Sequence, residues 1–186
     1  MQNYWKMIIE KLSNLGCLDE MSLNAPADEK MFSDLEAHIG VRLPESVRGV
    51  LSVHNGQSES VYTGLIYGEL LLSVDGIKRC WDDWRSIDEE DMNEDCAEFM
   101  ASEPEGVIKP VYTNRKWIPL THDVSGNHIG IDYDPDSNGT IGQIIKFGRD
   151  EDTKVLLADD FESFIKNFVL KLDGAVWKDK YLEIQV

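Results

Sequence analysis

The sequence predicts an α+β protein in which an antiparallel or mixed sheet of about four to six strands is covered by N-terminal helices and one C-terminal helix. Three observations support this prediction. Apolar residues recur at helical spacing in residues 4–54 and again in residues 161–172. Residues 117–145 instead alternate apolar with small or polar positions, as strands do. A sheet of this size needs a helical layer over its apolar face, so the two patterns belong to one fold.

Three helices are expected before any strand. The first is amphipathic and ends at Gly16, because glycine suits the residue after a helix. Asp28 can cap a second helix, which Gly40 closes. Pro44 fits the first turn of a third helix, which is expected to stop at residues 54–56, His-Asn-Gly.

The middle of the chain changes character twice. Residues 61–74 are β-prone but broken by two glycines, which predicts one or two short strands. Ser73 or Asp75 can then cap a helix that includes Trp84. Residues 88–105 are densely acidic and keep a loose helical period, so we expect them to fold back loosely onto the body.

The centre of the sheet is predicted to be a three-stranded antiparallel meander. Residues 117–120 form a short edge strand, because proline suits an edge. Residues 129–133 alternate as a half-buried strand does. Asn138-Gly139 favours a two-residue turn with positive φ at both positions, and residues 140–145 form the returning strand.

The C-terminal part is expected to add a strand and a long helix. Residues 153–158 read as a strand, and Asp159-Asp160 caps a helix that ends at Gly174. Residues 175–186 form a tail that either docks as a short strand or stays mobile. We therefore expect one domain over residues 1–186, with an acidic insertion at about 86–114.

Length and cysteine usage indicate a cytoplasmic protein. No apolar run approaches the ~20 residues that a membrane helix needs, and the N-terminus lacks the pattern of a secretory signal. Cys17, Cys80 and Cys96 are odd in number and far apart, which is typical of reduced thiols.

The charge balance is the unusual feature of the composition. The 18 basic and 35 acidic residues give a formal net charge of −17. A field of this sign repels phosphate backbones, which argues against nucleic acid as a ligand, and it accelerates encounter with a basic partner. It also keeps a protein soluble, and we expect a monomer or a weak dimer.

Residue patterns predict no catalytic group, metal ion or cofactor. Residues 134–141 match several positions of an EF-hand loop, but Ile145 stands where calcium needs a glutamate, so a hairpin turn is favoured. Cys80 or Cys96 could pair with His122 or His128 as nucleophile and base, but no third orienting group is recognisable and burial is favoured. Zinc is set aside because no His or Cys pair has ligand spacing.

The acidic stretch is the predicted partner-binding surface. Residues 82–105 contain eleven Asp or Glu against one Arg. A run of this kind is usually a solvated face, but carboxylates beside tryptophans also suit a Lys- or Arg-rich protein. The candidate contact residues are Asp82, Asp83, Trp84 as an aromatic anchor, Asp88, Glu89, Glu90, Asp91, Glu94 and Asp95.

Five short motifs, in order, resemble the SMI1/KNR4 family, also called the SUKH superfamily. They are Leu-Pro-Glu at 43–45, Val-His-Asn-Gly-Gln at 53–57, Trp-Ile-Pro-Leu at 117–120, Gly126-Asn127 leading into Ile131-Asp132, and Gly-Gln-Ile-Ile at 142–145. The resemblance runs from about Trp5 to Phe168. The acidic insertion is longer than the family pattern needs, and the tail after Gly174 has no counterpart in it.

The resemblance implies an α+β fold and a protein-binding role. The family includes bacterial immunity proteins, which bind and neutralise polymorphic or contact-dependent toxins, and a fungal cell-wall regulator that acts as a largely disordered hub. This chain looks compact, so we expect the bacterial type. Its partner would be a cognate basic toxin domain, for which a nuclease is one candidate. The alternatives are a non-catalytic regulatory scaffold and a carboxylate-dependent hydrolase.

Overall fold

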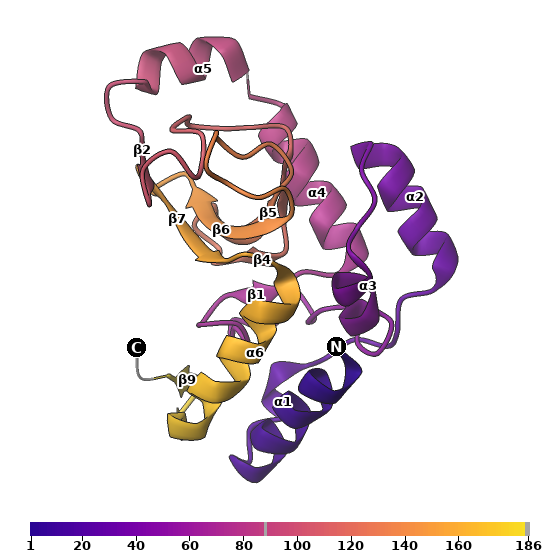
Figure 1. Ribbon diagram of the computed structural model, residues 1–186. Helices are drawn as coiled ribbons and strands as arrows, with labels where there is room; N and C mark the ends of the chain where they lie inside the picture. The colour runs from indigo at the N-terminus through magenta and orange to yellow at the C-terminus, as the bar shows by residue number, and fades with distance from the viewer. Residues whose placement is uncertain (88, 185–186) are drawn as a thin grey trace.

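The structure is a computed structural model that describes residues 1–87 and 89–184 (Figure 1). Its α-helices are α1 (Gln2–Asn14), α2 (Glu29–Ile39), α3 (Glu45–Leu51), α4 (Val74–Arg85), α5 (Glu89–Cys96) and α6 (Phe161–Lys171). Short 3-10 turns cover Asp19–Met21 and Leu172–Gly174. No helix within the described ranges has the length and apolarity needed to cross a membrane.

A five-stranded mixed sheet forms the centre of the molecule, with the order β2-β7-β6-β5-β3. Only the pair β2–β7 is parallel, and the other neighbours are antiparallel. These strands are β2 (Ala101–Glu103), β3 (Trp117–Pro119), β5 (Asn127–Asp132), β6 (Gln143–Gly148) and β7 (Thr153–Ala158). Two small sheets pair β1 (Leu70–Leu71) with β4 (Thr121–His122), and β8 (Val176–Lys178) with β9 (Tyr181–Glu183). The α+β prediction with a helix-covered mixed sheet is confirmed.

Local capping signals place several helices where the sequence predicted them. The Asp28 carboxylate accepts a hydrogen bond from the Met31 amide of α2 at 2.9 Å. Ser73, one of the two predicted caps, accepts from the Gly76 amide of α4. Each bond satisfies an amide that has no partner inside its helix.

The sheet is covered on both faces, so the prediction that residues 129–133 are half-buried is wrong for most of that strand. The row Ile118, Ile131 and Ile144 faces the main core, which includes residues of α1, α2, α4 and α6. Trp117, Ile145 and Phe147 face the other side and pack with Ile108 in a second, smaller core. Every residue of β5 is consequently buried.

The second core changes the interpretation of the predicted acidic insertion, residues 86–114. Only its first part is a solvated helix, since α5 has no buried residue. Its second part supplies the unpredicted parallel strand β2 and the fully buried Ile108. Figure 1 shows α5 standing apart from the sheet while the following chain returns across it.

The turn between β5 and β6 has a different backbone geometry from the predicted one. Asn138-Gly139 does not take positive φ; Gly142 does, at +94°, and β6 begins only at Gln143. The loop before β6 is instead held by residues 106–107, because the Asn138 amide donates to the Gly106 carbonyl at 2.9 Å.

Two further boundaries differ from the prediction or complete it. The third helix ends at Leu51, before the predicted stop at residues 54–56. The tail forms the β8–β9 hairpin as far as it is described, with residues 185–186 outside the described range.

Candidate functional site

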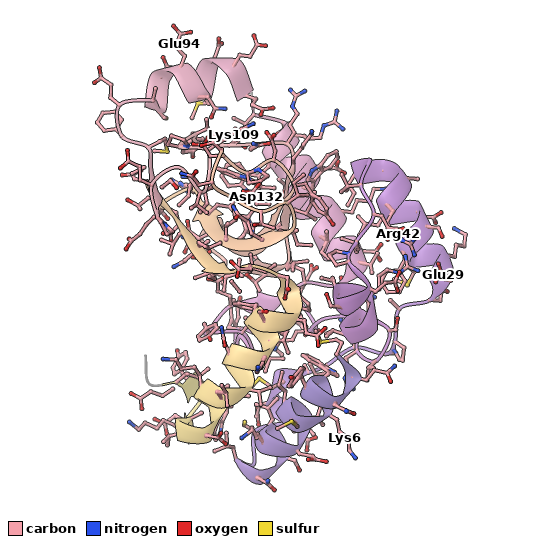
Figure 2. All side chains as sticks on the ribbon, in the orientation of Figure 1. Lys6, Glu29, Arg42, Glu94, Lys109 and Asp132 are labelled. Carbon is pink, nitrogen blue, oxygen red and sulfur yellow. The ribbon has the colours of Figure 1, made fainter. Side chains whose placement is uncertain are left out.

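The predicted partner-binding residues lie along α4, α5 and the connection between them. Figure 2 shows α5 as an outlying helix with Glu94 directed away from the body of the molecule. Asp88 lies outside the described residues. The exposed members of the predicted set are Asp82, Asp83, Glu90, Asp91, Glu94 and Asp95.

Some of these carboxylates are already engaged inside the chain. Asp82 lies 2.7 Å from His38 Nε2, and Glu89 pairs with Arg115 at 2.9 Å. Asp91 also has a partner within the chain. The predicted acids whose side chains form no ion pair with any described residue are Asp83, Glu90, Glu94 and Asp95.

Trp84 and Phe99 are aromatic residues beside this surface, and they differ in exposure. Trp84 is half-buried, and its ring packs near Tyr112 and Phe147 at centroid distances of 5.9 Å and 6.3 Å. It therefore packs against the second core, and its role as an aromatic anchor stays a prediction. Phe99, just beyond the end of α5, is 67% exposed. Its exposure could not be read from the sequence, because it shares the helical period of the residues that face inward.

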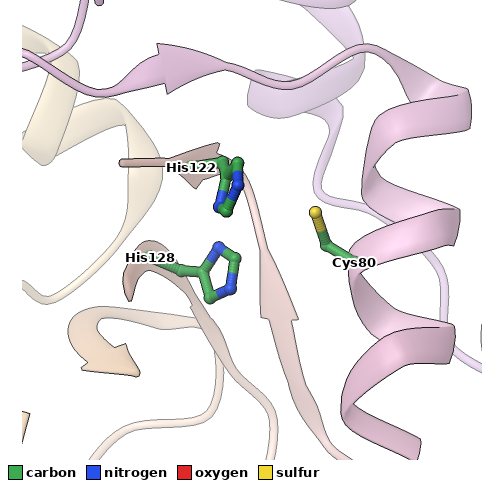
Figure 3. Close-up of side chains that lie close together, drawn as sticks. All are labelled: Cys80, His122 and His128. Atoms are coloured by element: carbon green, nitrogen blue, oxygen red, sulfur yellow. The ribbon is translucent and has the colours of Figure 1, made fainter. Parts of the chain in front are cut away.

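A second constellation joins residues that are distant in sequence. Cys80 lies on α4, His122 on β4 and His128 on β5, and one donor atom from each lies within 4.8 Å of the others. Figure 3 shows the Cys80 sulfur directed toward the two imidazole rings. The rings are stacked with centroids 5.3 Å apart. The argument from ligand spacing along the chain thus missed a cluster that only the fold brings together.

The electrostatics of this cluster do not activate a nucleophile. Burial, with a further contribution from the Asp83 carboxylate, raises the pKa of the Cys80 thiol to about 11. Burial lowers the pKa of His128 to about 4, so the imidazole is neutral near pH 7. A catalytic cysteine needs a lowered pKa, which this environment does not provide. The suggested nucleophile–base pair is therefore close in space but without thiolate character.

Two pockets adjoin the cluster. One of about 250 Å³ is lined by Trp84 and Tyr112 together with Cys80, His122 and His128. The other, of about 410 Å³, also reaches Cys80 and His122 from the side of α4. The cluster is consequently accessible from outside.

The EF-hand-like stretch is a loop closed by its own chain. The Asp134 carboxylate pairs with Lys109 Nζ at 2.7 Å and accepts from Asn114 Nδ2 at 2.9 Å. A carboxylate held by a lysine and an amide is already satisfied. The structure therefore gives a local reason for the hairpin-loop interpretation.

Comparison with known proteins gives a family and several relatives. Residues 26–167 match the SMI1 / KNR4 family (SUKH-1). The chain is similar to the cell wall assembly regulator SMI1 of Saccharomyces cerevisiae, at 28% identity over 84% of this chain and 37% of the relative. It is similar to the cell wall biosynthesis/cell cycle regulator smi1 of Schizosaccharomyces pombe, at 33% identity over 77% of this chain and 30% of the relative. A glucan synthesis regulatory protein of Neurospora crassa is 27% identical over 78% of this chain and 33% of the relative. The chain thus spans about a third of the length of these relatives.

These names correct one prediction and agree with another. The toxin-immunity interpretation is wrong, because the relatives are named as fungal regulators. It relied on the compactness of the chain, and a compact region can also form one part of a longer regulator. The expectation of a protein without enzymatic activity agrees with these names. The match over residues 26–167 confirms the resemblance seen in the five motifs, and the chain belongs to the SMI1 / KNR4 family.

Proposed function

We propose that this chain is the folded, protein-binding part of a non-catalytic regulator, of the kind that controls cell-wall assembly. The observation that carries the proposal is its similarity, over 77–84% of its length, to proteins named as regulators of cell-wall assembly, cell-wall biosynthesis and glucan synthesis. The raised pKa of the Cys80 thiol favours a role in binding over nucleophilic catalysis. Its free cysteines suit a reducing compartment, and we propose the cytoplasm.

The proposed binding surface is the acidic face of α4 and α5, defined by Asp82, Asp83, Glu89, Glu90, Asp91, Glu94 and Asp95. Its negative charge complements a Lys- or Arg-rich segment of a partner protein. Phe99 supplies an exposed aromatic group beside these carboxylates, and an aromatic side chain of this kind can bury substantial area at an interface. Neither nucleic acid nor a membrane fits this charge.

A segment replacement tests the regulatory role. In the Saccharomyces cerevisiae relative, the matched segment would be exchanged for this chain, and growth would be scored in the presence of an agent that perturbs the cell wall. The replacement should support growth better than a deletion of the segment. A replacement that accumulates in folded form yet behaves like the deletion would contradict the proposed role.

Charge variants test the surface in extracts of the same cells, where the salt concentration can be set. A photo-crosslinking residue at position 94 should capture a discrete partner with a basic segment. A triple variant would carry Asp83→Asn, Glu90→Gln and Asp95→Asn. It should reduce capture of the partner several-fold at low salt, because electrostatic steering is lost. The matched control replaces Glu20, Asp159 and Glu162, which are equally exposed and lie elsewhere. Equal capture by both triple variants would remove α4 and α5 from the interface.

A further inference from the structure

We propose that Cys80, His122 and His128 form a binding site for a transition-metal ion of the zinc class. The three residues come from a helix and two strands, so their backbones are fixed by separate elements of the fold. Their donor atoms already lie within 4.8 Å of one another. This inference is independent of the proposed regulatory function.

The spacing is close to that of a tetrahedral zinc centre. Bond lengths of ~2.0–2.1 Å to nitrogen and ~2.3 Å to sulfur place ligand atoms roughly 3.3–3.8 Å apart. Donor atoms within 4.8 Å of one another therefore need to approach by at most about 1–1.5 Å, a distance on the scale of small side-chain rotations.

The hydrogen bonds around His128 prepare it for coordination. Its Nδ1 lies 2.7 Å from the Thr121 carbonyl oxygen. A carbonyl can only accept, so Nδ1 carries the proton and Nε2 keeps its lone pair. Histidines that bind metals usually donate their second ring nitrogen in this way, which fixes both tautomer and ring orientation. His128 is 2% exposed and cannot turn away freely.

His122 provides a second, independent observation. Its Nδ1 is buried and has no hydrogen-bond partner among the described residues. A buried ring nitrogen without a partner is unfavourable, and such atoms are rare in folded proteins. Coordination of a cation through this nitrogen would satisfy it.

The donor set selects the class of ion. A thiolate and two imidazoles are borderline-soft ligands that favour Zn²⁺ and Co²⁺ over Mg²⁺ and Ca²⁺, which prefer oxygen. Three protein donors leave a fourth position for water in the adjoining pocket. On binding, the Cys80 thiol would release its proton to solvent and form the metal–sulfur bond as thiolate. The bound ion would join α4 to β4 and β5.

Cobalt is the probe that tests this site directly. The tag-free chain, reduced and treated with a chelator, would be titrated with Co²⁺ and followed by absorption. We expect one equivalent to bind with a thiolate-to-cobalt charge-transfer band and the intense visible bands of a tetrahedral centre, and Zn²⁺ to displace it. Mg²⁺ should neither bind nor displace. Absence of the charge-transfer band at saturating Co²⁺ would overturn the proposal.

Variants separate the cluster from adventitious binding. Cys80→Ser should abolish the charge-transfer band, and His122→Asn should weaken Co²⁺ binding by more than the ~10- to 100-fold typical of changes around a metal ligand. Cys96→Ser and His38→Asn, which change a thiol and an imidazole outside the cluster, should leave the spectrum intact. Circular dichroism would confirm that each variant is folded. If Cys96→Ser removes the band, or Cys80→Ser keeps it, the assigned site is wrong.

Discussion

Gln57 shows why a family motif can be structural. Its side-chain amide donates to the carbonyls of Met21 and Thr63 at 2.8 Å and 2.9 Å. Its side-chain oxygen accepts from the amides of Leu65 and Leu71, each at 3.0 Å. The residue is 2% exposed, and three of the four backbone groups that depend on it are in buried hydrogen bonds.

Replacing Gln57 by leucine should destabilise the protein severely. The similar volume avoids a large cavity, but four backbone groups lose their partners, and the three in buried hydrogen bonds should each cost ~1–3 kcal/mol. We expect the free energy of unfolding, measured with urea, to fall by about 4 kcal/mol or more. The control Gln2→Leu, at an exposed position, should change it by less than ~0.5 kcal/mol. A small effect at position 57 would mean that these groups find other partners.

Glu69 gives the stability a specific pH dependence. Burial raises the pKa of this carboxyl to about 7, while the hydrogen bond from the Thr121 hydroxyl and the charge of Lys146 oppose the shift. The folded protein therefore holds a proton that the unfolded chain releases near pH 4.5. The stabilisation by this group is complete below pH 4.5 and is lost as pH rises through 7.

Glu69→Gln should remove that dependence. Between pH 4.5 and pH 8 the wild type should lose about 3 kcal/mol of unfolding free energy relative to the variant. Urea unfolding across this pH range measures the unfolding free energy of both proteins. Taking the difference between them removes the contribution of titratable groups that the two proteins share. An exposed control, Glu162→Gln, should run parallel to the wild type. A constant difference between wild type and Glu69→Gln would show that Glu69 ionises normally.

At the scale of single elements, α5 is held by few contacts. It has eight residues and no buried side chain, and isolated helices of this length are marginal in water. Asn93 attaches it to the following loop, donating to the Thr113 carbonyl and accepting from the Thr113 amide, both at 2.9 Å. Glu89 of α5 also pairs with Arg115 and Asp91 has a partner within the chain, so Asn93 is one of several polar attachments of a helix without buried side chains.

Amide hydrogen exchange should reveal this weak attachment. We expect amides of α5 to exchange at least ~100-fold faster than those of β5 and β6, because local opening exposes little apolar surface. Asn93→Ala should accelerate exchange in α5 further while leaving the central strands unchanged. Asn3→Ala, at an exposed position of α1, serves as the control. Protection of α5 equal to that of β5 would contradict this description.

Elements with local signals could be predicted, and those that depend on distant partners could not. The caps at Asp28 and Ser73 act within four residues, so the sequence places their helices closely. Strand β2 exists only because β7 lies beside it, and its own residues carry no strand pattern. The burial of the second sheet face depends on Ile108, which follows the acidic stretch in the sequence.

The same distinction applies to the candidate sites. The acidic surface is contiguous in sequence and could be proposed from charge alone. The cluster could not, because Cys80 and His122 are 42 positions apart and meet only through the packing of α4 on the sheet. Gln57 belongs to one of the motifs that indicated the family, and in the structure its side chain hydrogen-bonds four backbone groups.

At the scale of the whole molecule, the charge of −17 works against compactness. Like charges repel more strongly in the folded protein than in the expanded chain. Raising ionic strength from about 0.01 M to about 0.1 M shortens the screening length from ~30 Å to ~10 Å. We therefore expect NaCl to increase the free energy of unfolding by on the order of 1 kcal/mol.

A charge-reduced variant checks the origin of this effect. Neutralising Glu90, Glu94 and Asp95 should make the unfolding free energy less sensitive to NaCl, as measured by thermal or urea unfolding at several salt concentrations. The same comparison with KCl excludes an effect specific to sodium. A wild type whose stability falls with salt would mean that attractive ion pairs dominate the balance.

The borders of the central sheet have a consequence for storage and handling. One border is β3, three residues long, where Pro119 has no amide proton to offer. The other is β2, also three residues long and followed directly by Pro104. Neither border presents the long row of free amides and carbonyls on which fibrils grow. Concentrated preparations of the native protein should therefore resist fibril formation even after salt has masked their mutual repulsion.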